Sequence, residues 1–545
     1  MILVPGKRGK ETDYERIQIF RNHAGLFEKR SDEPEAVKKF IDYLAKMGYN
    51  MLELYTEDTY RPEGEPYFGY LRGGYTGAEI REIDAYAASK GVELVPCIQT
   101  LAHFTNLVKM PVYEPIVDTA DILLIDDEKT YALIEKLFAF AAENFTSRLI
   151  NIGMDEAHMV GLGAYLDRHG YCDRFELLLR HLSRVAEIAK KYGFRPHMWS
   201  DMFFRLANHG EYYKKDMHIA PEIREKVPEN IGLTYWDYYN EKPEVYDSML
   251  ASHKEFGREV WFAGGAWCWN GFTPVYGKTR RAMKPAMESV RKNGIENVFI
   301  TMWGDNGKEC SFFSMLPMLY EIRQYADGNF DKEKISRGFY ELTGYKAEDF
   351  ELLCLPDSTA QMLNGTKMEN PSKCLLYSDC FLGIFDTEAE AEGKLPYEEY
   401  ARKLSDAAGR MGEFGYLFAS QSALCSLMEF KSLLGVRTRA AYRSGDKKAI
   451  AALTEEYRTA QERLENFYGK FRTLWFTENK AIGWEVQEVR LGGLMLRLRS
   501  CRERLEAFAA GKIDRIEELE EEILPFGYDA VFSNFYRGLV SRSEL

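Results

Sequence analysis

Short apolar runs alternate with amphipathic segments along the first 335 residues, and this alternation limits the fold more than any other feature. Helical patterns separate the runs; in the first of them, Val37, Phe40, Ile41 and Leu44 share one face. The runs that predict buried strands are Arg16–Phe20, Met51–Tyr55, Glu93–Ile98, Leu149–Ile152, Pro196–Trp199, Gly232–Trp236, Val260–Ala263 and Asn297–Met302. Eight strands, each followed by a helix, predict an α/β fold of the (β/α)8 barrel type.

The alternation stops beyond residue 335, where long helical patterns take over. We therefore expect a short N-terminal segment of residues 1–14, a barrel over 15–335 and a mostly α-helical C-terminal domain over 336–545. A doubly wound parallel sheet is the alternative for the first part. That fold needs a glycine-rich phosphate turn early in the chain, and none appears.

Composition narrows the functional classes. The 545 residues are 46% hydrophobic, an ordinary globular balance, and the net charge of −14 disfavours nucleic-acid binding. No apolar run is long enough to predict a membrane helix, and residues 1–13 lack a secretory signal pattern. Nine cysteines without a CxxC pair disfavour zinc-ribbon and dithiol sites, and free thiols fit a cytoplasmic location.

Polar and aromatic side chains directly follow the predicted strands, which is where (β/α)8 barrels carry their active sites. One tryptophan at such a position usually indicates core packing, but here there are five: Trp199, Trp236, Trp267, Trp269 and Trp303. Flat aromatic rings suit the C–H faces of a sugar, while carboxylates and arginine suit its hydroxyls. The pattern predicts a carbohydrate pocket.

Two adjacent carboxylates, Asp155 and Glu156, follow the fourth predicted strand. Glycoside hydrolysis needs a carboxylic acid to protonate the leaving oxygen and an anion beside the positively charged sugar carbon. Repulsion between neighbouring carboxylates raises the pKa of one of them, as a general acid requires. An Asp-Glu pair is common by chance, so its place at a strand end is what favours a catalytic role.

Several motifs together resemble glycoside hydrolase family 20, the β-N-acetylhexosaminidases, in a bacterial intracellular branch. The similarity runs from about residue 15 to 500. The motifs are LINIGMDEAH (149–158), LYTEDTYRPEGEPYFGYLRGGYT (54–76), VPCIQTLAHF (95–104), TYWDYYN (234–240), FAGGAWCWNGF (262–272), TMWGDNG (301–307) and ENKAIGWEVQEVRLGGL (478–494).

The resemblance implies a substrate-assisted, retaining mechanism, in which the 2-acetamido carbonyl of the sugar attacks the anomeric carbon and forms an oxazolinium intermediate. Asp155 would orient the acetamide N–H and face the positive charge, and Glu156 would be the general acid and then the base. No protein nucleophile, metal or cofactor is implied. The implied substrate is a small oligosaccharide that ends in N-acetylglucosamine, or alternatively in N-acetylgalactosamine.

The resemblance also implies a set of binding residues. Arg21 would grip hydroxyls O3 and O4, and Asp305 would bind O4 or O6. Tyr235 or Tyr238 would donate its hydroxyl to the acetamide oxygen, with Tyr235 favoured because it stands in a Tyr-x-Asp motif. The remaining expected residues are the pocket tryptophans Trp199, Trp267, Trp269 and Trp303, the neighbours Trp236 and Asp237, and the supporting residues Asp58 and His103.

Other functions stay open at this point. A metal-dependent hydrolase could use His103, Asp155, Glu156 and His158, but the sequence has no HExxH or paired-histidine spacing. The segment Gly271–Thr279 does not match a phosphate-binding loop, because five residues separate its glycines where that motif has four. A catalytically inactive sugar-binding barrel is the third alternative, although both carboxylates are present. Leucine- and arginine-rich C-terminal helices could pair in a homodimer.

Overall fold

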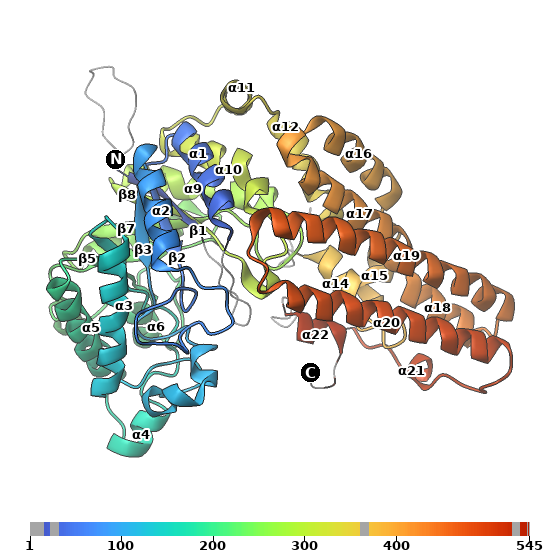
Figure 1. The fold of residues 1–545 in the computed structure, drawn as a ribbon, viewed down its shortest axis with the longest axis horizontal. Coiled ribbons are helices and arrows are strands. Elements are labelled where there is room, and N and C mark those ends of the chain that lie inside the picture. The colour runs from blue at the N-terminus through green and yellow to red at the C-terminus, as the bar shows by residue number, and fades with distance from the viewer. Residues whose placement is uncertain (1–15, 22–31, 360–369, 526–534, 542, 544–545) are drawn as a thin grey trace. The chain divides into compact units, whose positions relative to one another are not determined.

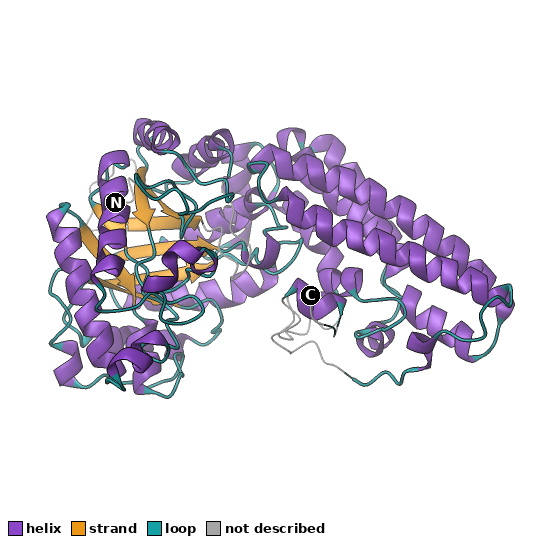
Figure 2. Ribbon diagram, turned by 60° about the horizontal axis from the view of Figure 1, so that its bottom comes forward, coloured by secondary structure: helices purple, strands orange, loops and turns teal. Residues whose placement is uncertain are grey.

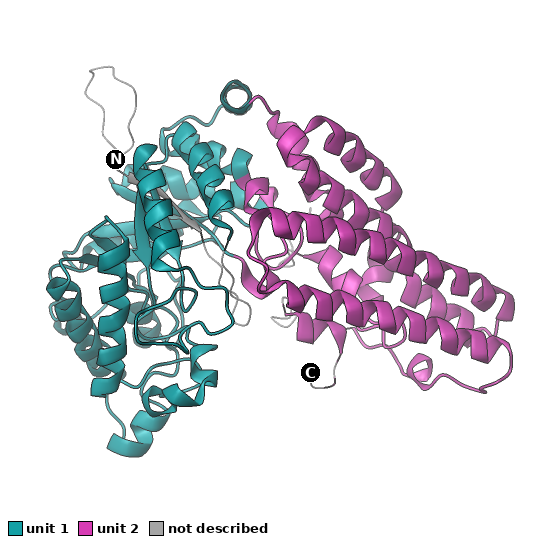
Figure 3. Ribbon diagram, viewed as in Figure 1, with its two compact units in different colours: residues 1–267, 278–303, 316–343 teal, residues 268–277, 304–315, 344–545 magenta. Residues whose placement is uncertain are grey.

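The computed structural model describes residues 16–21, 32–359, 370–525, 535–541 and 543, and for residues 16–21 it describes the backbone alone. The chain divides into two compact units (Figure 3). Unit 1 comprises Met1–Trp267, Lys278–Trp303 and Leu316–Thr343. Unit 2 comprises Cys268–Gly277, Gly304–Met315 and Gly344–Leu545, so the segments that follow the last two strands belong with the C-terminal helices.

Unit 1 contains a closed parallel barrel, with each strand beside the next and β1 beside β8 (Figure 2). This confirms the predicted barrel. The strands are β1 Arg16–Arg21, β2 Met51–Tyr55, β3 Glu93–Cys97, β4 Leu149–Asn151, β5 Arg195–Trp199, β6 Gly232–Trp236, β7 Val260–Gly265 and β8 Asn297–Met302.

The longer helices pack around the barrel through one apolar face. Val37, Phe40 and Ile41 of α1 are fully buried, and a capping box between Thr76 and Glu79 starts α2. The helices of unit 1 are α1 Pro34–Lys46, α2 Gly77–Ser89, α3 Glu128–Asn144, α4 Ala164–His169, α5 Arg174–Lys191, α6 Asp201–Ala207, α7 Pro221–Arg224, α8 Pro243–Lys254, α9 Tyr276–Lys292 (its first turn in unit 2), α10 Leu316–Ala326 and α11 Lys332–Thr343.

Side chains of alternate strand residues fill the barrel interior. His197 of β5 lies 3.2 Å from Glu53 of β2 through its Nε2, and 3.1 Å from the Thr234 hydroxyl of β6 through its Nδ1. Since β2 and β5 are not neighbours, these side chains meet across the interior. Tyr235, next to Thr234 on β6, must therefore point outward to the helices.

Unit 2 is helical, and its two longest helices, α19 and α20, run beside each other (Figure 1). Trp484 joins them, because its ring lies 5.5 Å from Phe471 and 5.6 Å from Trp475. The helices are α12 Ala347–Glu351, α14 Pro371–Tyr377, α15 Asp386–Glu392, α16 Tyr397–Arg410, α17 Gly415–Lys431, α18 Leu434–Arg443, α19 Lys447–Glu478, α20 Trp484–Ala509, α21 Glu517–Glu520 and α22 Tyr536–Val540. Among the described helices of both units, none combines the length and apolar character needed to cross a bilayer.

A buried ionic cluster within unit 2 holds the segment Gly304–Met315. The Glu309 carboxylate lies 2.8 Å from Lys373 Nζ of α14 and 2.8 Å from Arg490 Nη1 of α20. Both cations also donate to the backbone carbonyl of Asn306, at 2.9 and 3.0 Å. All three charged side chains are almost completely buried. Helices from distant parts of the sequence therefore fix the backbone just beyond β8.

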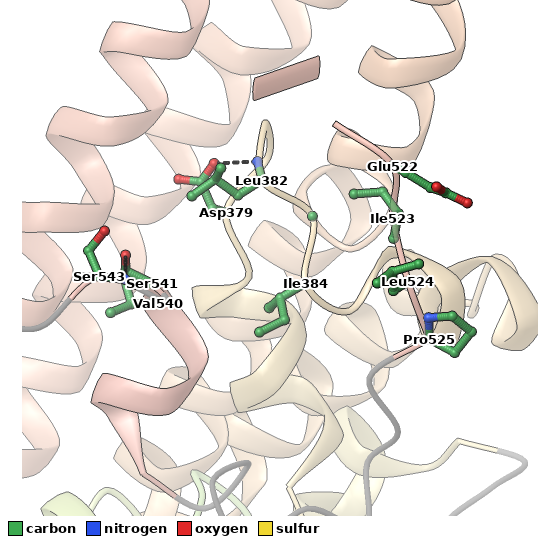
Figure 4. Close-up of a pocket in the computed structure, with 11 residues that line it drawn as sticks. Asp379, Leu382, Ile384, Glu522, Ile523, Leu524, Pro525, Val540, Ser541 and Ser543 are labelled. Carbon is green, nitrogen blue, oxygen red and sulfur yellow. Dashed lines mark hydrogen bonds between the residues drawn. The ribbon is translucent and has the colours of Figure 1, made fainter. Parts of the chain in front are cut away.

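Unit 2 also contains a cavity of about 430 Å3, shown in Figure 4. Its walls come from three parts of the chain that are far apart in the sequence, 379–384, 522–525 and Val540, Ser541 and Ser543. Most of the lining is apolar, as at Leu382 and Ile523, and its described lining residues include no aromatic ring. This lining differs from the aromatic and acidic surface that a sugar pocket needs.

Candidate active site

The loop after β4 presents the two adjacent carboxylates. Gly153, Met154 and Glu156 all have a positive φ, of 72°, 76° and 52°. Gly153 must be glycine, because a Cβ there would lie 1.9 Å from the side-chain oxygen of Gln99. A loop held in this conformation costs free energy and is typical of a functional site. The turn gives Asp155 and Glu156 different surroundings.

Asp155 is the better shielded of the two, with 13% of its side chain exposed. His103 Nε2 lies 2.9 Å from one carboxylate oxygen, and Gln99 Nε2 donates to the other at 3.0 Å. Burial alone would raise the pKa of Asp155, but the charge and hydrogen bond of His103, with the Gln99 hydrogen bond, outweigh it and lower that pKa. Asp155 is thus prepared to act as an anion.

A ring of polar contacts supports this arrangement. Gln99 also donates to the Tyr55 hydroxyl at 2.9 Å, and Tyr55 donates to Glu57 at 2.8 Å. Glu57 lies 4.0 Å from His103 Nδ1, which completes the ring back to Asp155. The sequence predicts that Asp58 gives this support, but Asp58 instead pairs with Arg72 at 3.4 Å, and Glu57 is the acid that faces His103.

Glu156 is more open, with 37% of its side chain exposed. One carboxylate oxygen lies 3.7 Å from Arg205 Nη2, and the other lies 3.9 Å from His103 Nε2. Its backbone N–H donates to Asp201 at 3.2 Å. An exposed carboxyl fixed at its backbone can both meet a substrate and exchange its proton with water.

Asp201, the first residue of α6, is a third carboxylate that the sequence analysis did not single out. It is completely buried and accepts a hydrogen bond from Arg205 Nε at 2.9 Å. Burial raises the pKa of Asp201 to about 7; Arg205 opposes this rise, and the charges of Asp155 and Glu156 add to it. The signal in the sequence is an Asp and an Arg four residues apart on a helix that begins at a strand end.

The raised pKa of Asp201 predicts a pH-dependent stability. The folded chain keeps this proton up to about pH 7, whereas an unfolded aspartate loses it near pH 4. The contribution of Asp201 to stability therefore falls between about pH 4 and pH 7, by about 4 kcal/mol in total. We expect Asp201→Asn to remove this fall, so that its melting temperature gains on the wild type between pH 5 and pH 8. A constant difference between the two proteins would contradict the prediction.

Aromatic rings gather beside the carboxylates. Trp303 lies 6.1 Å from Trp199, 5.4 Å from Tyr55 and 6.2 Å from Tyr238, measured between ring centroids. Trp236 stacks on Tyr238 at 5.3 Å. Burial raises the pKa of Tyr238, and the charge of Asp155 adds to this rise, so Tyr238 lies in the field of Asp155. Trp303 is the ring of this group that remains partly exposed.

Trp267 also belongs to this group. Its indole N–H donates to the Tyr238 carbonyl at 2.7 Å, and Lys278 Nζ lies 3.5 Å from its ring centroid. The structure therefore brings together four of the five predicted tryptophans.

Two further expected residues are used elsewhere in the fold. Tyr235 is completely buried, its hydroxyl donates to Asp237 at 2.6 Å, and its ring packs against His253 at 5.0 Å. Asp237 accepts the backbone N–H groups of Tyr239 and Asn240, and so holds the turn after β6. Since Tyr235 points outward from the barrel, Tyr238 replaces it as the candidate for the acetamide oxygen.

Other predicted residues stay predictions. The Arg21 side chain is outside the described part of the chain, although its backbone ends β1. Trp269 and Asp305 belong to unit 2. In the described ranges, no group of three or more His, Cys, Asp or Glu residues is arranged to hold a metal ion.

Two family models match separate parts of the chain. The model of the "Glycosyl hydrolase family 20, catalytic domain" matches residues 53–247, which include His103, Asp155, Glu156 and Asp201. The model of the "Glycoside Hydrolase 20C C-terminal domain" matches residues 348–534.

Individual proteins are more distant. A β-hexosaminidase of Vibrio furnissii is 30% identical over 198 residues, which are 32% of this chain and 31% of that protein. The chain thus spans about a third of the length of this curated relative. A solved exo-β-N-acetylglucosaminidase of Vibrio harveyi is 16% identical, with a TM-score of 0.45 over 61% of this chain and 58% of that one. A solved β-N-acetylhexosaminidase of Bacteroides fragilis is 17% identical, with a TM-score of 0.44 over 60% of this chain and 69% of that one.

Proposed function

The chain belongs to glycoside hydrolase family 20, and from this premise we propose that it is an exo-acting, retaining β-N-acetylhexosaminidase. Its substrates are small oligosaccharides with a terminal N-acetylglucosamine or N-acetylgalactosamine. The observation that supports this proposal is the contrast between two adjacent acids, Asp155 shielded and hydrogen-bonded, Glu156 open. A cytoplasmic location, the bacterial intracellular branch and a homodimer stay predictions from the sequence.

The two acids suit the two halves of a substrate-assisted reaction. The acetamide carbonyl oxygen forms a bond to the anomeric carbon while the glycosidic C–O bond breaks, and Glu156 gives its proton to the leaving oxygen. Asp155 accepts a hydrogen bond from the acetamide N–H and stabilises the positive charge of the oxazolinium ring. The Glu156 carboxylate then takes a proton from water as the water attacks the anomeric carbon, and the bond between the acetamide oxygen and that carbon breaks, which opens the oxazolinium ring. An intramolecular nucleophile has a high effective molarity, so the protein needs to orient it rather than supply one.

A panel of three aryl glycosides tests the reaction. We expect release of the chromophore from the β-N-acetylglucosaminide and the β-N-acetylgalactosaminide, and none from the plain β-glucoside, which lacks the acetamide nucleophile. A thiazoline mimic of the intermediate should inhibit. A heat shift with N-acetylglucosamine but no turnover would indicate an inactive sugar-binding barrel, and loss of activity with a chelator would indicate a metal-dependent hydrolase.

The acetamide-binding tyrosine has its own test. We expect Tyr238→Phe to lower kcat/KM for the aryl N-acetylglucosaminide about 10- to 100-fold, because one hydrogen bond to a developing charge is lost. Tyr235→Phe is the matched variant on the outward face of β6, and we expect it to affect melting temperature more than kcat/KM. A larger kinetic loss at Tyr235 would return the role to that residue.

A further inference from the structure

The outward side of α20 carries exposed apolar residues. The buried side of this helix packs through residues such as Leu491, Leu494 and Leu498. On the opposite side lie Val489 and Leu496, with 71% and 61% of their surface exposed. They are two helical turns apart, so both side chains lie in one line along the helix. A single exposed apolar residue needs no explanation, but an aligned pair on a long helix is typical of a surface that packs against a second helix.

Two adjacent glycines, Gly492 and Gly493, lie between these side chains in the middle of α20. Glycine destabilises a helix interior relative to alanine, so this pair is unfavourable for the helix itself. Within the described ranges, a Cβ at Gly492 would lie within 4 Å of no other segment, and one at Gly493 would meet the Tyr536 hydroxyl at an ordinary 3.8 Å. Packing inside the chain therefore does not require either glycine. Their missing side chains leave room for the backbone of another helix to approach.

The charges on this side of α20 have opposite signs at its two ends. Glu485 lies one turn before Val489, and its exposed carboxylate accepts the backbone N–H of Gly483 at 2.6 Å. Arg499 lies one turn after Leu496 and is also exposed. Among the residues that the structure describes, none forms an ion pair with Arg499. The line of apolar residues and glycines therefore has an acid at one end and a base at the other.

A second copy of α20 that runs in the opposite direction matches all these features. Two helices approach most closely where their side chains are smallest, so we place a two-fold axis at the two glycines. Val489 then packs against Leu496 of the partner subunit. Glu485 lies near Arg499 of the partner subunit. The symmetry repeats each of these contacts on the other side of the axis.

Charge selects this direction and this occupant. If two copies of α20 ran parallel, Glu485 would meet Glu485 of the partner subunit and Arg499 would likewise meet its own copy, and both pairs would repel. In the antiparallel arrangement, Glu503 faces the N-terminal end of the partner's helix, where the helix dipole favours a negative charge. An unrelated helix would not require opposite charges placed symmetrically about the glycines. The pattern therefore favours a second copy of this chain.

We propose that the α20 face, defined as Glu485, Val489, Gly492, Leu496 and Arg499, joins two copies of this chain in an antiparallel, two-fold dimer. The inference goes beyond the proposed function, because it concerns unit 2 and uses no residue of the candidate active site. It gives the homodimer predicted from the sequence a specific contact surface. One helix crossing is small for a protein interface, so the dimer dissociates on dilution, with a dissociation constant in the micromolar range.

Exchange of the two charges tests the direction of pairing. We expect the wild type to sediment as a monomer–dimer equilibrium in a dilution series by analytical ultracentrifugation. Glu485→Lys and Arg499→Glu each bring like charges together twice in the dimer. Each should raise the dissociation constant about 10- to 30-fold, since an exposed pair contributes modestly and two pairs are inverted. An equimolar mixture of the two variants should recover wild-type affinity as a heterodimer. Asp406→Lys, which reverses an exposed charge on α16, is the matched control and should change nothing.

Gly492→Ala separates association from folding. Alanine favours the helix, so the melting temperature in dilute solution should rise slightly. The added methyl group at the crossing should nonetheless raise the dissociation constant of the dimer about tenfold. Gly409→Ala on α16 is the control, because a Cβ there also lies within 4 Å of no other described segment. We expect that variant to leave the dissociation constant unchanged.

Association measurements decide this inference without any glycoside, so it can fail while the enzymatic proposal holds, and the reverse. A chain that stays monomeric up to its highest soluble concentration would overturn it. A dimer that neither the charge variants nor Gly492→Ala weaken would place the contact elsewhere and reject the α20 face. Charge variants that dissociate but do not recover on mixing would exclude the antiparallel pairing.

Discussion

Glu156→Gln is expected to lower kcat/KM for an N-acetylglucosamine disaccharide about 10^3- to 10^4-fold, near the upper range for loss of a general acid. Glutamine keeps the shape of the side chain and its place beside Arg205, but it has no proton to give to the leaving oxygen. With an aryl leaving group of low basicity the loss should be smaller, because such a group departs with little protonation. Steady-state rates on the two substrates measure the difference.

Glu143→Gln is the matched control, because Glu143 is an exposed glutamate on α3. We expect it to keep wild-type rates. If Glu156→Gln retained wild-type turnover of the disaccharide, Glu156 would not be the acid. An equal loss on both substrates would show that the variant damages something other than proton donation.

The second large effect is expected at Asp155. Asp155→Asn should lower kcat about 10^3-fold, because the variant loses the negative charge that faces the oxazolinium ring, and its neutral amide oxygen is a weaker acceptor for the acetamide N–H. KM should change less, since both effects act mainly in the transition state. The thiazoline mimic should bind more weakly by a similar factor, which calorimetry can measure without turnover.

The control for Asp155 is Asp167→Asn, an exposed aspartate on α4 that should leave rates and inhibitor binding unchanged. Asp155→Asn within tenfold of the wild type in kcat would contradict the assigned role. Loss of kcat with unchanged binding of the mimic would point to a disturbed loop rather than a lost charge.

The barrel could be predicted because parallel strands covered on both faces are nearly continuous apolar runs, and those runs stand out in the sequence. Asp155 and Glu156 could be placed at the C-terminal end of a barrel strand for the same reason, since they directly follow one of these runs. Asp201 could not be assigned, because its role depends on a contact between the β4 and β5 loops. The resemblance predicts Asp58 as a supporting acid, but Glu57, which has a φ of 43°, is the acid that faces His103, and this depends on the conformation of the loop.

For Tyr235 the prediction from a motif conflicts with the geometry of the strand. Strand alternation does hold on β6, and the contact of Thr234 with His197 shows which face points inward. The Tyr-x-Asp motif favours Tyr235 as the residue that binds the acetamide oxygen. Its position on β6, however, directs the Tyr235 side chain toward the surrounding helices. Segments 268–277 and 304–315 belong to the same unit as the C-terminal helices. This grouping could not be predicted from the sequence, because it depends on long-range contacts such as that between Glu309 and Arg490.

The ion cluster at Glu309 limits how this protein could have been assembled in evolution. A gene fragment that stopped near residue 335 would encode Glu309 without Lys373 and Arg490, so the segment Gly304–Met315 would lose both cations that hold it. Exchange of the C-terminal half for an unrelated module would remove the same two contacts. The two halves are therefore expected to be inherited as one unit, with recombination tolerated only where both cations travel with their carboxylate.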